Sequence, residues 1–390
     1  MGSVNLDLLE QVDQFLSRPG QVWLLGAGIS KDAGLPLMWD LTARVVALAN
    51  GKPHYKALTS LQGELPADAH IEHILSHLGD YTALAQRSNE KKVSINADEF
   101  TVGDLDAAHR AIAADIASVI RWGYKVEKGV DPIVGTPDAP IVSVDHHRRF
   151  VRALCDTRQA GVADRRGAVQ LFTTNYDTLL EDALALERYA YWDGFSGGAV
   201  AFRTHRFGQP IPDSGFRANV IKLHGSIDWY MSDEGHVYRV REFDLYPAKD
   251  GRVLIYPQAT KYIATQRDPF ASQFALFRDA LTNAKENVLV VCGYSFGDEH
   301  INQEIELAMS APENKTTLIA FCGEFGSLPA TLNTWRNETW GKRIYVLSEK
   351  GLYAGTDGPL YPPEPGQEPH NWWTFGGMTQ FLENGNGGSI

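Results

Sequence analysis

Short apolar runs alternate along this chain with longer segments in which apolar residues recur at helical spacing. Each run is bounded by glycine or polar residues, which is typical of a buried strand in a parallel sheet. The runs lie at residues 22–25, 169–172, 220–223, 288–292, 316–322 and 343–347. The pattern predicts an α/β fold with a Rossmann-like, mostly parallel sheet.

The segment between the first two runs predicts a helical insertion subdomain. Its apolar residues have helical spacing at 58–63, 71–78 and 105–122. We therefore expect residues 42–168 to form the insertion and residues 1–41 and 169–350 to form the core. A segment rich in proline and glycine at 355–370 indicates a C-terminal arm over 351–390.

A glycine-containing turn follows the first run. Gly26 and Gly28 allow the backbone to turn tightly and to approach a phosphate without a Cβ between them. We expect a helix to start near Ser30 and to present its N-terminal N–H groups to a pyrophosphate. Lys31 stands where the dinucleotide fingerprint has its third glycine, so a plain tight turn is the alternative. The dinucleotide-binding residues predicted here are Gly26, Ala27, Gly28 and Ser30.

Two candidate catalytic residues follow the second and third runs. Asn175 lies in Thr174-Asn175-Tyr176-Asp177, and His224 lies in the sequence Lys-Leu-His-Gly-Ser. Parallel strands place their carboxyl ends along one edge of the sheet, so both side chains should face one crevice. The alternatives are an Asn175 that caps the next helix and a His224 that occupies a turn.

A second glycine loop follows the run at 288–292. Its candidate ligand groups for a ribose or a phosphate are Ser295 and the backbone around Gly293. Asp298 could contact the adenosine half of a dinucleotide. The alternative is a strand-to-helix turn in which Asp298 is the N-cap of a helix over 299–309.

The four motifs, in this order, resemble those of the silent-information-regulator (sirtuin) family. The resemblance spans roughly residues 20–325 and includes Ala33-Gly34-Leu35-Pro36, although Leu37-Met38-Trp39 replaces the family's Asp-Phe-Arg. It implies that Asn175 holds the reacting ribose or a water. It also implies that His224 is the general base and that Asp177 faces the nicotinamide carboxamide.

Cysteine usage separates two activities within that family. Protein-deacylating sirtuins usually carry a zinc held by two Cys-x-x-Cys pairs, whereas this chain has three cysteines and no such pair. We therefore expect no metal and favour hydrolysis of NAD+, which would be the substrate, over deacylation. Three cysteines make no even disulfide framework, which also indicates a reducing, cytoplasmic location.

Charge and hydropathy limit the partners. The net charge of −12 argues against direct binding of nucleic acid by this chain alone. No apolar run approaches the length of a membrane span.

The resemblance extends to the partners. Residues 293–298 are similar to the corresponding loop of sirtuin-like proteins in bacterial antiphage defence. The resemblance implies an NAD+ hydrolase that releases nicotinamide and ADP-ribose, forms a homo-oligomer and pairs with a hexameric HerA-type ATPase. Three alternatives stay open: an NAD-dependent protein deacylase, a non-catalytic NAD- or ADP-ribose-sensing subunit, and a nuclease that acts with an ATPase partner.

Overall fold

The structure is a computed structural model. It describes residues 7–158, 167–212, 214–232, 234–241, 252–254 (backbone only), 268–282 and 287–385.

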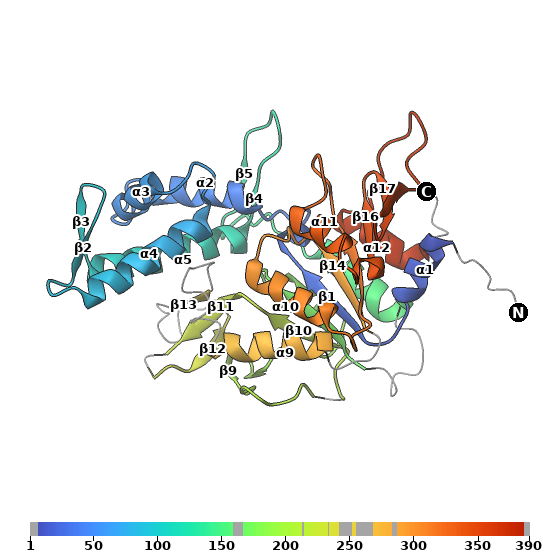
Figure 1. The fold of residues 1–390 in the computed structure, drawn as a ribbon. Coiled ribbons are helices and arrows are strands. Elements are labelled where there is room, and N and C mark those ends of the chain that lie inside the picture. Colours follow the sequence, from blue (N-terminus) through green and yellow to red (C-terminus); the bar gives the residue numbers. More distant parts are fainter. Residues whose placement is uncertain are drawn as a thin grey trace, which may run out of the picture.

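One large sheet occupies the centre of the molecule (Figure 1). Its strands are β1 Gln21–Leu25, β6 Val169–Thr173, β7 Tyr191–Trp192, β10 Ala218–Lys222, β14 Val288–Cys292, β15 Thr317–Phe321, β16 Ile344–Ser348, β17 Gly351–Ala354 and β18 Asp357–Leu360. The nine strands are ordered β18-β17-β16-β15-β14-β1-β6-β10-β7. Every pair from β16 to β7 is parallel, and only β17 and β18 add antiparallel pairs. The predicted α/β fold and its mostly parallel sheet are confirmed.

Helices cover both faces of this sheet, because alternate strand residues point to opposite sides. Trp23 and Leu25 pack on one face, and Val22 and Leu24 pack on the other. The first face is covered by α1 Leu8–Phe15, α6 Asp145–Arg152, α7 Leu179–Leu186 and α12 Phe375–Asn384. The second face is covered by α9 Phe270–Thr282, α10 Glu299–Ser310 and α11 Ala330–Arg336.

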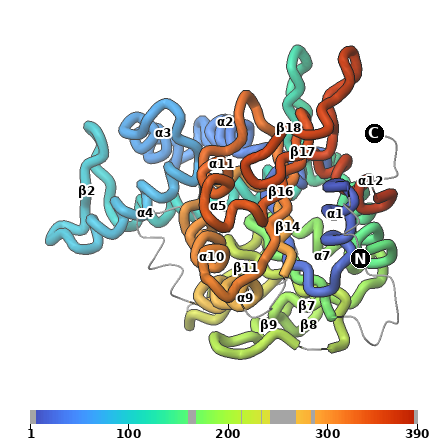
Figure 2. Tube along the Cα trace, turned by 45° about the vertical axis from the view of Figure 1, so that its right-hand side comes forward, coloured from blue at the N-terminus to red at the C-terminus, as the bar shows by residue number. Residues whose placement is uncertain are grey.

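The predicted helical segments between the first two core strands form helices with a hydrophobic core of their own. These helices are α2 Met38–Ala49, α3 Tyr55–Glu64, α4 Ile71–Arg87 and α5 Val102–Trp122. Two small hairpins accompany them: β2 Lys92–Ile95 with β3 Asp98–Thr101, and β4 Tyr124–Lys125 with β5 Ile133–Val134. In Figure 2, β2, α3 and α4 of this region lie at the left, away from α1 and α12 at the right.

A second, five-stranded sheet has the order β13-β11-β12-β9-β8. Its strands are β8 Phe195–Gly197, β9 Val200–Arg203, β11 Gly225–Met231, β12 Val237–Val240 and β13 Arg252–Leu254. Because β11 starts one residue after His224, the chain passes directly from the central sheet into this smaller one.

The boundaries at residues 42, 169 and 351 stay predictions, and the packing bears on two of them. Phe150 and Leu154 pack in the hydrophobic cluster on the first face of the central sheet, which α1 and α12 also cover. This packing favours an insertion that ends before α6. Phe375 and Phe381 pack in the same cluster, and β17 extends the sheet beyond β16. Much of the segment expected to be an arm is therefore packed against the core.

The helix expected near Ser30 is absent from this part of the described chain. Residues Ala27–Ser30 form a single 3-10 turn, and the next α-helix starts at Met38. That prediction was wrong because Pro36 and the left-handed Gly34, with φ of 88°, interrupt the segment. Phosphate binding by a helix N-terminus at Ser30 is therefore not supported.

None of the helices within the described residues is both long and apolar enough to cross a membrane.

Candidate functional site

The four motifs meet at one edge of the central sheet. Leu25 is in register with Thr173 on one side and with Cys292 on the other, and Thr173 is in register with Lys222. The four strands therefore end at the same level, and the loops that follow them emerge together. This is the crevice position expected for ligands of open α/β sheets.

The two glycine loops pack directly against each other. A Cβ on Gly26 would lie 2.4 Å from the carbonyl oxygen of Gly293, and one on Gly28 would lie 2.7 Å from its Cα. The N–H of Gly26 donates to the carbonyl of Cys292 (3.0 Å), and that of Gly28 donates to Gly293 (2.9 Å). The glycines are thus required for close backbone packing, and these two amides are already used within the protein. A role of the loop in phosphate binding stays a prediction.

Ser30 joins Asn175 and Asp177 in one buried network. The hydroxyl of Ser30 donates to Oδ2 of Asp177 (2.8 Å), and Nδ2 of Asn175 donates to the oxygen of Ser30 (3.1 Å). Because the Ser30 proton goes to a carboxylate, its lone pairs face Asn175, which fixes the orientation of the amide. The carboxamide oxygen Oδ1 of Asn175 is buried and has no hydrogen-bond partner among the described residues.

The turn after β6 assigns the capping role to Asp177. Its Oδ1 accepts from the N–H of Leu179, the first residue of α7, at 3.0 Å. The side chain of Asn175 donates to Ser30 instead, so it does not serve as the helix cap considered above. A buried carboxamide held in this way can accept a hydrogen bond from a ligand hydroxyl.

His224 lies beyond the end of β10, in a turn that precedes β11. Its Nε2 is 2.9 Å from Oδ2 of Asp298, and the two side chains are 8% and 12% exposed. The two atoms are at ion-pair distance but out of line for a hydrogen bond. The ring of Tyr176 is also near, with its centroid 6.4 Å from that of His224.

Asp298 is also the N-cap of α10. Its Oδ1 accepts from the N–H of His300 at 3.0 Å, so the capping role considered as the alternative for Asp298 is observed, and its contact with a dinucleotide stays a prediction. The loop before it is held by Asn302, whose Nδ2 donates to the carbonyl of Phe296 (2.7 Å). Ser295 is exposed at the surface of this loop.

Lys222 is a site residue that the sequence analysis missed. Its ammonium donates to the backbone carbonyl of Asp177 and lies 3.5 Å from Oε1 of Glu181. Lys222 is 1% exposed and Glu181 is 5% exposed, so burial raises the pKa of Glu181 while the nearby Lys222 opposes that rise. The available signal was a lysine inside the apolar run at 220–223.

Tyr176 connects this turn to the helical region. Its hydroxyl donates to Oε1 of Glu72 on α4 at 2.8 Å. The residue between Asn175 and Asp177 is thus held by a side chain about 100 positions earlier in the chain.

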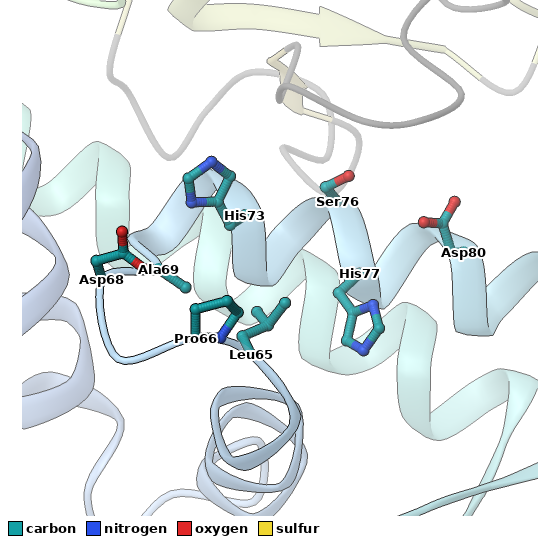
Figure 3. Close-up of a pocket in the computed structure, with 8 residues that line it drawn as sticks. All are labelled: Leu65, Pro66, Asp68, Ala69, His73, Ser76, His77 and Asp80. Atoms are coloured by element: carbon teal, nitrogen blue, oxygen red, sulfur yellow. The ribbon is translucent and has the colours of Figure 1, made fainter. Parts of the chain in front are cut away.

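A surface hollow on α4 offers a contrasting group of polar side chains. It has a volume of about 370 Å³ and is lined by residues of α4 and of the loop before it, including His73, His77 and Asp80 (Figure 3). The rings of His73 and His77 point in different directions. Across the described ranges, no three His, Cys, Asp or Glu side chains are grouped to hold a metal ion.

Residues 169–340 match a family model described as a SIR2-like domain. The matched region contains Asn175, Asp177, His224 and the loop at 293–298, whereas the first glycine loop precedes it. No curated protein matches the chain. The match supports a sirtuin-like family and an NAD-related activity, since SIR2-like domains are generally NAD-dependent enzymes.

Proposed function

We propose that this protein hydrolyses NAD+ at the bond between nicotinamide and ribose. The observation that carries the proposal is the arrangement of two buried polar side chains at neighbouring strand ends of a SIR2-like domain. Asn175 has an unpaired carboxamide oxygen, and His224 has a carboxylate beside its ring. The amide can hold a ribose hydroxyl or a water, and the imidazole can accept a proton.

The chemistry suits these two residue types. Nicotinamide leaves as a neutral molecule from a cationic glycosidic bond, so the departing group needs little acid assistance. Water attacks C1′ of the ribose, the C1′–N bond breaks toward the nicotinamide ring, and His224 takes the proton of the water. The products are nicotinamide, ADP-ribose and a proton. A positioned general base typically contributes about a hundred- to ten-thousand-fold in rate.

Asp177 and Ser30 fit supporting roles. Each carboxylate oxygen of Asp177 accepts one hydrogen bond within the protein and retains lone-pair capacity for the carboxamide N–H of nicotinamide. Ser30 fixes the orientation of Asn175, as described above. Gly293 and Ser295 remain the candidates for contacts with the rest of the dinucleotide.

Hydrolysis is favoured over deacylation by the cysteines. Cys155, Cys292 and Cys322 are all buried, and none of them forms a disulfide. Burial raises the pKa of the Cys322 thiol to about 12, as expected of a structural thiol. No pair of them can supply the zinc module that the resemblance associates with protein deacylases.

The biological role forms a further part of the proposal and is supported by the resemblance alone. We infer a cytoplasmic, NAD-depleting effector of antiphage defence that forms a homo-oligomer and acts with a HerA-type ATPase. The activity of such an enzyme must be regulated. The hydrogen bond from Tyr176 to Glu72 gives the helical region a direct contact with the catalytic turn.

The test is turnover of NAD+ by the purified full chain, with and without a co-purified ATPase partner. Asn175→Ala and His224→Ala should each abolish most of the activity, whereas Asn333→Ala and His236→Ala change exposed residues of the same types and should retain it. Binding of NAD+ without turnover in either preparation would favour a sensor. Turnover that requires an acyl-lysine peptide would favour a deacylase. Metal-dependent cleavage of nucleic acid that survives in His224→Ala would favour a nuclease.

A further inference from the structure

His224 and Asp298 come from strands that are not neighbours. In the sheet order β14-β1-β6-β10, two strands separate the one that precedes Asp298 from the one that precedes His224. At about 4.8 Å per strand, their axes lie about 14 Å apart. The contact therefore depends on the loop at 293–298 reaching across the ends of β1 and β6.

The glycines of the two loops make that reach possible. Gly293 has a φ of 67°, and a Cβ there would lie 2.5 Å from the N–H nitrogen of Ile29. With Gly26 and Gly28 beneath it, the loop lies directly on the turn after β1. A larger residue at these positions would lift the loop and move Asp298 away from His224.

Asp298 is fixed independently of His224. Its Oδ1 accepts from the N–H of His300, and its backbone carbonyl accepts from the N–H of Asn302 (2.9 Å) and the hydroxyl of Tyr294 (3.1 Å). Oδ2 is the carboxylate oxygen that lies 2.9 Å from Nε2 of His224. The carboxylate is therefore part of a rigid helix start.

We propose that Asp298 is the positioning residue of the general base His224, and this inference rests on the proposed hydrolase. The negative charge of Oδ2, 2.9 Å from Nε2, attracts a proton on Nε2 electrostatically although the two atoms form no linear hydrogen bond. This favours the tautomer with the proton on Nε2, which leaves the lone pair on Nδ1. Nδ1 then accepts the proton of the attacking water. The imidazolium that forms is stabilised by the carboxylate, which itself stays ionised.

This role differs from the contact with the adenosine half of the dinucleotide that the sequence suggested. A residue that binds adenosine would change the KM for NAD+. A residue that positions the base would change kcat. The two roles can therefore be separated by steady-state kinetics.

Asp298→Asn removes the negative charge of the side chain and keeps an oxygen that can cap α10. Asparagine caps helices as well as aspartate does, so its carbonyl can still accept from His300. The midpoint of thermal unfolding should stay close to that of the wild type, and Asp298→Ala should lower it. Asp104→Asn is the matched control, since Asp104 accepts from Thr101 at the start of α5 in the helical region.

The first measurement is 15N NMR of the full chain with labelled histidine, in which His224→Gln assigns the resonance. The wild type should show His224 as the Nε2–H tautomer, and Asp298→Asn should shift the population toward the other tautomer. Identical tautomer populations in the two proteins would overturn the proposal. This measurement does not depend on activity.

The second measurement is the kinetics of NAD+ hydrolysis. Asp298→Asn should lower kcat by about 10²- to 10⁴-fold with little change in KM. The double variant with His224→Ala should lose no more activity than His224→Ala alone. A raised KM with unchanged kcat would overturn the positioning role in favour of adenosine binding. A wild type that fails to hydrolyse NAD+ would contradict the proposed function, and the NMR result would still decide whether Asp298 positions the ring.

Discussion

The strand-end site and the surface of α4 both gather histidines and acidic residues, but they do so in different ways. On α4, His73 and His77 come from adjacent turns of one helix; His77 pairs with Glu64 (3.0 Å), and His73 stacks on His70. At the strand ends, His224 meets a carboxylate from a different part of the chain in a buried setting. The spacing of residues in the sequence indicates which side chains share a helix face. A site additionally requires that distant segments converge and exclude water.

The largest expected contrast concerns the histidines themselves. His224→Ala should lower the kcat of NAD+ hydrolysis by about 10²- to 10⁴-fold, because the general base is lost. His77→Ala, in the hollow on α4, should leave kcat unchanged. Steady-state kinetics on the two variants tests this difference. Equal losses of activity would mean that α4 belongs to the catalytic site.

A second contrast concerns lysines in ion pairs. Lys222→Met removes the cation beside the enclosed Glu181 and should lower the free energy of unfolding by about 3–5 kcal/mol. Lys52→Met breaks a pair with Asp115 in which the lysine side chain is 44% exposed, and should cost about 1 kcal/mol or less. Urea unfolding measures both values. Adding Glu181→Gln should recover part of the loss caused by Lys222→Met, and failure to do so would contradict the pairing.

A third contrast uses pH. Burial lowers the pKa of His147, beneath the central sheet, to about 4, whereas it is about 6.5 in an unfolded chain. The unfolded state therefore binds more protons between these pH values, so His147 contributes stability above pH 6.5 that is lost as the pH falls toward 4. Between pH 7 and pH 4.5, the free energy of unfolding of the wild type should fall by about 2–3 kcal/mol more than that of His147→Leu.

His70 on α4 provides the comparison for this pH effect. Burial, followed by the charge of His73, also lowers the pKa of His70 to about 4, but its side chain is only partly buried. The pH dependence of the free energy of unfolding should therefore change less in His70→Leu than in His147→Leu. Parallel pH profiles of unfolding for the wild type and His147→Leu would contradict the burial of a neutral His147.

The smallest effect concerns two similar hydrogen bonds on α4. Tyr176 donates to Glu72 and Tyr81 donates to Glu64, but only Tyr176 belongs to the strand-end turn. Both phenylalanine variants should lose about 0.5–1.5 kcal/mol of stability. Tyr176→Phe alone should also lower kcat, by about two- to tenfold, the rate equivalent of that energy. An unchanged kcat would show that this bond does not couple the helical region to the site.

The sequence predicted the strands well and the contacts poorly. Continuous apolar runs as short as that of β14, bounded by turn residues, are typical of buried parallel strands, and their order placed Asn175 and His224 at one sheet edge. The helix expected near Ser30 was predicted incorrectly, because Pro36 and the left-handed Gly34 interrupt the segment, and residues 27–30 form a 3-10 turn instead. Asp298 reaches His224 across two intervening strands, and no local sequence pattern indicates a contact between such distant segments.

The measurement that tests the central claim most directly is the product balance of NAD+ incubated with the full chain and its partner. For each NAD+ consumed by the wild type, chromatography should find one nicotinamide and one ADP-ribose, and Asn175→Ala should form both more than about 100-fold more slowly. NAD+ that is bound but left intact, or nicotinamide released only when an acyl-lysine peptide is present, would contradict the hydrolase.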